Sequence, residues 1–172
     1  MKLRVFIPFF NAEDFLERCL SSVVSQERLD WTAHTYNDSS NDLSGAIAKQ
    51  WAEGDSRIFH FDSVTPVGML GNFERFLAQS IHDPEDVIVQ VDGDDWLPDP
   101  GVFSRVAKAY CDENVWITYG NFLRVGEGKS QVGYCEQVPD AASVRNLPWT
   151  STALRTFKVH LARKIKPASS GR

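Results

Sequence analysis

Short apolar runs recur along the chain, and polar residues follow several of them directly. The clearest run is Val87–Val91, whose β-branched residues predict a strand that is buried on both faces. Asp92, Asp94 and Asp95 follow it without a break. Four further runs also predict strands, at Leu3–Pro8, Trp31–Asn37, Ile58–Phe61 and Val115–Leu123. After the last run, a turn at Gly126–Lys129 predicts a hairpin that returns through Gln131–Tyr134.

Helical periodicity separates these runs. Apolar residues from Phe15 to Val24 recur at helical spacing and predict a helix over Ala12–Gln26, with Asn11 as its N-cap. Further helices are expected at Leu43–Trp51, Asn72–Ile81, Pro100–Tyr110 and Thr152–Ile165. Strands that alternate with helices predict an α/β fold, with a mostly parallel central sheet flanked by helices on both faces. A short β-hairpin and a C-terminal helix complete the expected fold.

Three of the predicted strands end in polar or turn residues, at Pro8–Asn11, Asn37–Asp42 and Asp92–Asp95. Parallel strands bring these ends to one edge, where open α/β sheets bind ligands. The carboxylates gathered there repel one another, and Mg²⁺ or Mn²⁺, which prefer oxygen ligands, would relieve that repulsion. The sequence therefore predicts an acidic crevice about the size of a nucleotide. Taken alone, Asp92–Asp95 is also typical of a solvated turn, and that interpretation stays open.

Composition and charge narrow the class of protein. The 172 residues are 42% hydrophobic and 24% charged, which favours one soluble domain. No apolar run has the roughly 20 residues that a membrane span needs, and no signal peptide is expected. Cys19, Cys111 and Cys135 lack metal-binding spacing and are odd in number, which favours a reduced, cytoplasmic setting.

The net charge of −5 hides an asymmetry between the two parts of the chain. Residues 1–100 hold 7 basic and 18 acidic side chains, whereas residues 101–172 hold 11 basic and 5 acidic ones. The acidic part is unsuited to nucleic-acid binding. The basic end either offsets the acidic part, which we favour, or faces phosphates or an anionic surface, so peripheral membrane contact stays open.

Two common phosphate-binding motifs are absent from the sequence. No Walker A pattern occurs, and the glycines of GMLG at 68–71 do not have the spacing of a dinucleotide fingerprint. Phosphate is therefore expected to bind through a metal ion rather than through a glycine-rich loop.

Several ordered motifs together carry a resemblance to a known family. The chain resembles a family 2 glycosyltransferase of the GT-A fold, in the nucleotide-diphospho-sugar transferase superfamily, and its third helix is similar to rhamnosyltransferase-like members. The resemblance covers roughly residues 3–125. The motifs that carry it are IPFFNAEDFLERCLSSVVSQ, NDSSND, VGMLGNFERFL and VDGDDWLPDP, and TALRTFKVHL is similar to a late helix of some members.

The resemblance implies an activity and roles for residues. The activity is inverting transfer of a sugar from a UDP- or dTDP-linked donor to a hydroxyl of a glycan, protein or lipid, with Mn²⁺ or Mg²⁺ as cofactor. Asp94 would bind the metal ion. Nucleotide-sugar binding would fall to Pro8 and Phe10 at the base, Asp38 at the base imide, Asp92 at the ribose, and Asn11, Asn72 and Gly93.

The sequence departs from the family pattern in two respects. Asn37 and Ser39 replace an Asp and a Gly of the family loop, and Asn72 stands where many members have Arg. No general base is recognisable either, because the acids after Leu123 lie in no family motif; they are Glu127, Glu136 and Asp140.

The missing base leaves the organisation of the chain and its function open. We expect a single domain over residues 1–166, with a donor-binding part at 1–125, a short acceptor-side part at 126–166 and a tail at 167–172. The chain is then either a truncated donor-binding domain or an enzyme that binds its acceptor differently. Two other functions stay open, namely a non-catalytic nucleotide-sugar-binding remnant and an interaction module that docks through its basic last helix.

Overall fold

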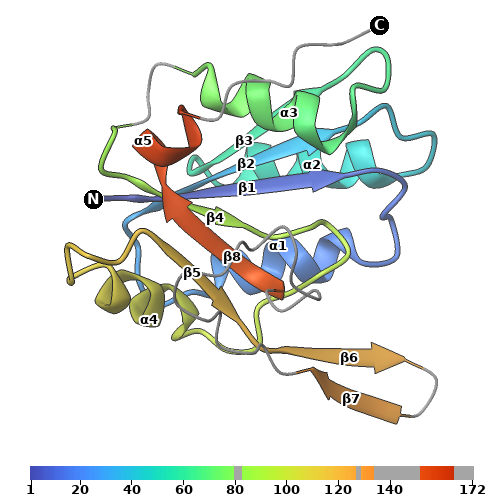
Figure 1. The fold of residues 1–172 in the computed structure, drawn as a ribbon. Coiled ribbons are helices and arrows are strands. Elements are labelled where there is room, and N and C mark those ends of the chain that lie inside the picture. The colour runs from blue at the N-terminus through green and yellow to red at the C-terminus, as the bar shows by residue number, and fades with distance from the viewer. Residues whose placement is uncertain (80–82, 127–128, 134–151, 165–172) are drawn as a thin grey trace, which may run out of the picture.

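A computed structural model describes residues 1–79, 83–126, 129–133 and 152–164 of the chain (Figure 1). Within these ranges, a six-stranded sheet has the order β3-β2-β1-β4-β8-β5, and β6 and β7 form a separate hairpin. The predicted α/β class, with a mostly parallel sheet between helices, is confirmed. The strands are β1 Leu3–Phe9, β2 Trp31–Asn37, β3 Ile58–Asp62, β4 Val87–Gln90, β5 Ile117–Gly120, β6 Phe122–Gly126, β7 Lys129–Gly133 and β8 Thr152–Lys158.

The first four strands run parallel and end at the same edge of the sheet. β1 pairs with β2 from Leu3↔Trp31 to Phe9↔Asn37, and with β4 from Leu3↔Val87 to Phe6↔Gln90. Every residue of β1 is buried, as expected for a strand that is covered on both faces. This register brings the polar segments that follow β1, β2 and β4 to one edge, as the sequence predicts.

Helices cover both faces of the sheet. On one face α1 (Leu16–Val24), α2 (Ser44–Gly54) and α4 (Val102–Ala109) share one core cluster with alternate residues of β1, including Val5 and Ile7. On the other face α3 (Gly68–Leu77) and α5 (Val159–Ala162) pack on a smaller, aromatic cluster. That cluster includes Phe6, Tyr36 and Phe76. In the part of the chain that the structure describes, no helix is long and apolar enough to cross a membrane.

The prediction of a helix over Thr152–Ile165 is wrong for most of its described part. Thr152–Lys158 forms β8, which runs antiparallel between β4 and β5, and only Val159–Ala162 is α-helical. The apolar spacing that suggested a helix is local, whereas β8 forms because β4 and β5 each offer it unpaired backbone groups. The interaction module built on a long basic C-terminal helix therefore loses its structural basis.

The predicted start of α1 and the assignment of Asn11 as its N-cap are also wrong. The helix begins at Leu16 with Phe15 in the N-cap position, because the chain first makes a turn over residues 13–15. Asn11 has a φ of 49°, a left-handed conformation that Asn tolerates better than most residues. Its side-chain oxygen accepts a hydrogen bond from the backbone N–H of Asn41, so it links two loops instead of capping a helix.

Other boundaries move by a few residues. α3 begins at Gly68 rather than Asn72, and the single strand predicted at Val115–Leu123 is divided into β5 and β6. The predicted hairpin is present as β6 and β7. Residues 127–128 within its turn and the tail at 167–172 lie outside the described residues. The division into donor-side and acceptor-side parts stays a prediction.

Candidate functional site

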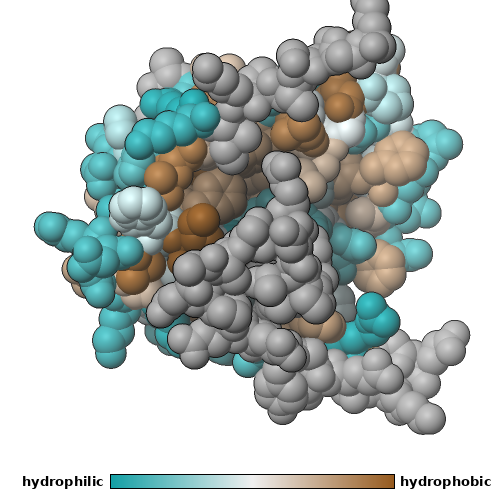
Figure 2. Space-filling model, viewed as in Figure 1, coloured by the Kyte–Doolittle hydropathy of each residue, from teal (hydrophilic) through white to brown (hydrophobic). Residues whose placement is uncertain are grey.

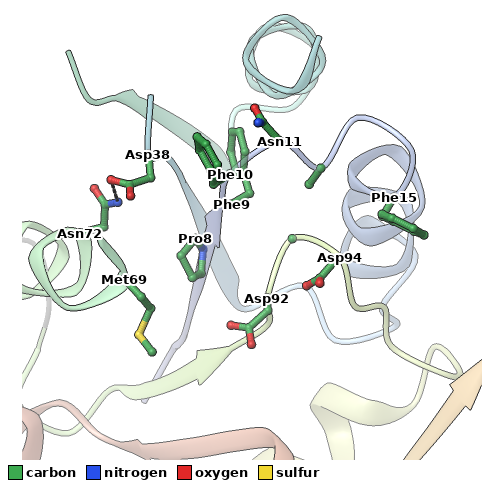
Figure 3. A pocket seen from close by; sticks show the side chains of 12 residues that line it. Pro8, Phe9, Phe10, Asn11, Phe15, Asp38, Met69, Asn72, Asp92 and Asp94 are labelled. Atoms are coloured by element: carbon green, nitrogen blue, oxygen red, sulfur yellow. Dashed lines mark hydrogen bonds between the residues drawn. The ribbon is translucent and has the colours of Figure 1, made fainter. Parts of the chain in front are cut away.

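A pocket of about 410 Å³ opens at the carboxyl edge of the sheet (Figure 3). This volume is typical of small-molecule sites. All eight residues that the sequence assigns to the donor or the metal line it, namely Pro8, Phe10, Asn11, Asp38, Asn72, Asp92, Gly93 and Asp94. Four lining residues were missed: Phe9, Ala12, Phe15 and Met69. They are apolar, and their spacing alone could not distinguish them from core residues.

The pocket has two acidic walls. Figure 3 shows Asp38 beside Asn72 on one side, and Asp92 and Asp94 on the other, with Pro8 and Phe10 between the two walls. Pro8 and Phe10 lie at the end of β1, Asp38 follows β2, and Asp92 and Asp94 follow β4, whereas Asn72 belongs to α3. A parallel register therefore brings together side chains that are far apart in the sequence.

Gly93 fixes the loop after β4 against β1. Its backbone N–H donates to the carbonyl oxygen of Pro8 at 3.0 Å, and a Cβ at this position would lie 2.5 Å from the Cβ of Phe9. Only glycine allows this approach. The N–H of Asp95 then donates to the carbonyl of Asp92 at 2.9 Å, which closes the turn. Asp92 and Asp94 are thus held at the pocket wall by backbone bonds on both sides of the loop.

Negative charge is concentrated on this loop. Burial raises the pKa of the Asp95 carboxyl, the charges of Asp94 and Asp92 raise it further, and the charge of Arg155 opposes them. Burial also raises the pKa of the Cys19 thiol, with the same three carboxylates adding to the effect. Cys19 is therefore an inert buried side chain. A loop with such mutual repulsion favours a bound cation.

The side chains at this wall fit a magnesium or manganese ion that arrives with phosphate. In the described ranges, no group of three or more His, Cys, Asp or Glu side chains could hold a metal ion by itself. Mg²⁺ commonly takes only one or two protein carboxylates and completes its shell with substrate phosphates and water. Asp94 provides such a carboxylate at the pocket wall.

Asp38 is held by the start of α3. Its Oδ1 accepts hydrogen bonds from the backbone N–H of Val67 at 2.8 Å and of Gly68 at 3.2 Å, and from Asn72 Nδ2 at 3.0 Å. Its Oδ2 accepts a bond from Gly68 N–H at 3.0 Å. These bonds explain why α3 begins at Gly68, whose φ of 73° suits glycine. Oδ2 accepts fewer bonds than Oδ1 and keeps capacity for a ligand.

Asn72 is fully buried and supports Asp38 from behind. Its Oδ1 accepts bonds from Ser63 Oγ and from Arg75 Nη1, both at 3.2 Å, while its Nδ2 donates to Asp38. Both ends of the amide are therefore occupied. An arginine, which many family members have here, would not fit this buried amide position without rearrangement.

Asn37, another departure from the family pattern, has a partner that explains it. Its Nδ2 donates to Asp62 Oδ1 at 2.9 Å, and its Oδ1 accepts from the N–H of Ser40 at 2.9 Å. Lys49 lies 2.8 Å from the other oxygen of Asp62. An aspartate at position 37 would place a second carboxylate against Asp62, whereas the amide can donate to it. The network fixes the loop that begins with Asp38.

Fold and pocket together define the class of protein. A mostly parallel sheet with a carboxylate-lined pocket at its carboxyl edge is the arrangement of GT-A glycosyltransferases, and the solved structures it matches have this fold. The sequence model of the family described as "Glycosyl transferase family 2" matches residues 4–170. The chain therefore belongs to this family.

Two curated relatives are similar to the chain. The glycosyltransferase GlyA of Streptococcus pneumoniae serotype 4 is 25% identical over 173 residues, which cover 91% of this chain and 23% of GlyA. The uncharacterized glycosyltransferase EpsJ of Bacillus subtilis is 37% identical over 54 residues, which cover 31% of this chain and 16% of EpsJ. The chain thus spans less than a quarter of each relative.

The similarity to solved structures extends over most of the fold. TarS 1–349 of S. aureus superposes with a TM-score of 0.71 at 18% identity, covering 95% of this chain and 48% of TarS. Its complex with UDP-GlcNAc gives a TM-score of 0.67 at 16% identity, with coverages of 95% and 47%. The mannosyltransferase PcManGT of Pyrobaculum calidifontis, in complex with GDP-Man and Mn²⁺, gives 0.62 at 18% identity, with coverages of 69% and 35%.

Proposed function

We propose that this chain binds a UDP- or dTDP-linked sugar with Mn²⁺ or Mg²⁺ and takes part in inverting transfer of the sugar to an acceptor hydroxyl of a glycan, protein or lipid. The observation that carries the proposal is that one pocket is lined from three strand ends, by Phe10 after β1, Asp38 after β2, and Asp92 and Asp94 after β4. The nucleotide-sugar complexes of the similar TarS and PcManGT structures support it. The rhamnosyltransferase-like likeness stays a prediction.

The nucleoside would occupy the wall formed by β1 and β2. The ring of Phe10 is 58% exposed at the pocket and offers a surface on which a base can stack. The Oδ2 of Asp38 would accept the imide N–H of a pyrimidine base, because among the described residues it accepts a single bond, from Gly68. A uracil or thymine imide presents a donor that suits this carboxylate.

The opposite wall would hold the ribose and the leaving group. Asp92 would accept hydrogen bonds from the ribose hydroxyls, while Gln90 Nε2, 3.0 Å from Asp92 Oδ1, holds that carboxylate in place. Asp94 would bind the metal ion, which when bound would offset the charge that develops on the departing diphosphate. The fixed loop positions both carboxylates before the donor arrives, so little reorganisation is needed.

The general base that an inverting transfer requires is not assigned. The acids that follow Leu123 lie outside the described residues: Glu127, Glu136 and Asp140. Among the described residues, no observation favours docking through a basic C-terminal helix, because most of that segment is β8.

Release of nucleoside diphosphate tests the proposal. The chain would be incubated with UDP- and dTDP-linked sugars, with Mn²⁺ or with EDTA, with and without simple glycan acceptors. We expect Mn²⁺-dependent release that Asp94→Asn abolishes and Asp99→Asn retains, because Asp99 pairs with exposed Arg105 outside the pocket. Release that survives EDTA or Asp94→Asn would contradict the metal role. Donor binding without any release would favour the non-catalytic remnant.

A further inference from the structure

The donor pocket lacks a positive side chain among the described residues that line it. Its lining includes three carboxylates but no Lys, Arg or His. Asn72, where many family members have Arg, is buried and donates to Asp38 instead. A nucleoside diphosphate brings negative charge that one metal ion does not fully neutralise, so a cation beside the pocket would favour its binding.

The antiparallel strand β8 places such a cation beside the acidic wall. Arg155 of β8 lies opposite Gln90 of β4 in the strand register. Directly opposite residues of an antiparallel pair project from the same face of the sheet. The side chain of Gln90 donates to Asp92 Oδ1. The face of the sheet that carries Gln90 and Arg155 therefore adjoins the acidic loop Asp92–Asp95. Figure 1 shows β8 beside β4, on the side away from β1.

The charge of Arg155 reaches the loop. Arg155 is partly buried in β8, and its positive charge lies within electrostatic reach of the Asp95 carboxylate. Hydrophobic side chains reach the surface over the sheet between β8 and β5 (Figure 2), and Ile117, at the level of Phe157, is exposed.

We propose that Arg155 is a donor-binding residue whose guanidinium contacts the diphosphate of the nucleotide sugar. This inference rests on the proposed function and deepens it. Arginine suits the role because its planar fork can bind two phosphate oxygens at once. Arg155 thus supplies from β8 the positive charge that Asn72 does not supply from α3. The role could not be found from sequence, because residues 152–165 have helical spacing and were expected to form a helix rather than a strand beside β4.

A competing explanation is that Arg155 only offsets the repulsion between carboxylates. The two roles differ in what they do to ligands. Loss of a phosphate contact would weaken UDP binding but leave the affinity for uridine unchanged, because uridine carries no phosphate. If Arg155 only offsets charge, its removal should raise the affinity for Mn²⁺ and leave the affinities for UDP and uridine unchanged, since losing a cation beside carboxylates strengthens their binding of another cation.

The test compares Arg155→Met with wild type. Affinities for UDP with Mn²⁺, for uridine, and for Mn²⁺ alone would be measured by calorimetry, ligand-observed NMR and electron paramagnetic resonance, and dTDP and thymidine would be run in parallel. We expect the UDP dissociation constant to rise about ten-fold or more while the uridine affinity is unchanged. Arg155→Lys keeps a point charge without the planar fork, so its UDP dissociation constant should lie between those of wild type and Arg155→Met. Arg28→Met is the control, because Arg28 pairs with Asp30 at the opposite edge of the sheet.

Each other result overturns the assignment. An unchanged UDP affinity, or an equal loss for UDP and uridine, contradicts a phosphate contact. Tighter Mn²⁺ binding with unchanged UDP affinity assigns Arg155 to charge offset alone. If Arg155→Met does not fold, Arg155→Gln takes its place with the same expectations. Failure of the wild type to bind either nucleoside diphosphate contradicts the proposed function itself, whereas an effect of Arg155→Met confined to uridine contradicts only the role of Arg155.

Discussion

Asn72 donates a hydrogen bond from its side-chain amide to the Asp38 carboxylate, with 3.0 Å between Nδ2 and Oδ1. The two residues come from α3 and from the loop after β2, and Asn72 is fully buried. The pair links the pocket wall that contains Asp38 to α3, which packs on the aromatic cluster. The position of the proposed base-binding carboxylate therefore depends on a residue that itself has little access to the ligand.

Replacing Asn72 with Leu should weaken both the fold and the pocket. The change removes the Asn72 oxygen to which Ser63 and Arg75 donate, while Arg75 keeps its bonds to Ser63 Oγ and the Asp62 carbonyl, and it removes a donor from Asp38. Leaving buried polar groups unpaired costs about 1–3 kcal/mol, so urea unfolding should shift to lower concentration and UDP affinity should fall. Exposed Asn114→Leu is the control. Wild-type urea stability in Asn72→Leu would contradict the supporting role.

Gly93→Ala should disturb the contact between the loop after β4 and β1. The added Cβ would lie 2.5 Å from the Cβ of Phe9 and 3.3 Å from the carbonyl oxygen of Pro8, both of which belong to a central strand. Overpacking of this kind costs about 1–3 kcal/mol and should move Asp92 and Asp94 together. Thermal unfolding and UDP titration measure the two effects.

The matched control for this change is Gly54→Ala. No atom lies within 4 Å of a Cβ built at Gly54, at the end of α2. Alanine there should leave stability unchanged or raise it slightly. If Gly93→Ala and Gly54→Ala gave the same melting temperature and the same UDP affinity, the close approach of Gly93 to β1 would have no consequence.

Phe10→Ala should reduce nucleotide affinity and leave stability nearly unchanged. Its ring is exposed at the pocket, so little core packing is lost. Stacking of a base on an aromatic ring is worth about 1–3 kcal/mol, which corresponds to roughly 5- to 150-fold in the dissociation constant. Leu29→Ala, exposed near the start of β2, controls for loss of surface apolar area. A nucleotide affinity equal to that of the control would exclude stacking on Phe10.

Asp62 should make stability depend on acid pH. Burial alone would raise the pKa of its carboxyl, but bonds from Lys49 and Asn37, together with His60, outweigh burial and lower the pKa to about 2. The stabilising contribution of ionised Asp62 to the free energy of unfolding is therefore fully present above the unfolded pKa of about 3.9, and it is lost as pH falls toward 2.

Asp62→Asn isolates this contribution. Unfolding free energies of wild type and variant would be compared from pH 6 down to the acid limit of folding. The stability advantage of wild type should be constant above about pH 5 and shrink below about pH 4. Parallel pH curves for the two proteins would show that Asp62 is not held in the ionised state by its partners.

Much of the site could be predicted because it depends on local patterns. Buried parallel strands have continuous apolar sequences, and the polar residues that end them mark one edge of the sheet. These patterns alone predict that Pro8, Asp38 and Asp94 lie at one edge, and all three line the same pocket. The limits of β2 at Trp31–Asn37 also agree with the prediction.

The errors share a non-local cause. Leu154, Phe157 and Leu161 have helical spacing, yet residues 152–158 form β8 because β4 and β5 offer hydrogen-bond partners on both sides. Asn11 has the character of an N-cap, but Asn41 and Ser40, about thirty residues away, draw it into a link between loops. No window of neighbouring residues contains either partner. For the same reason Arg155 could not be placed near the acidic loop from sequence.

In the proposed function, Asp94 holds a metal ion that in turn holds the diphosphate. Isothermal titration of UDP and dTDP into wild type, Asp94→Asn and Asp99→Asn, each with and without Mn²⁺, tests it most directly. We predict that Mn²⁺ strengthens nucleoside diphosphate binding to wild type and to Asp99→Asn, and that Asp94→Asn loses this gain. An equal gain from Mn²⁺ in Asp94→Asn, or no gain in the wild type, would contradict the claim.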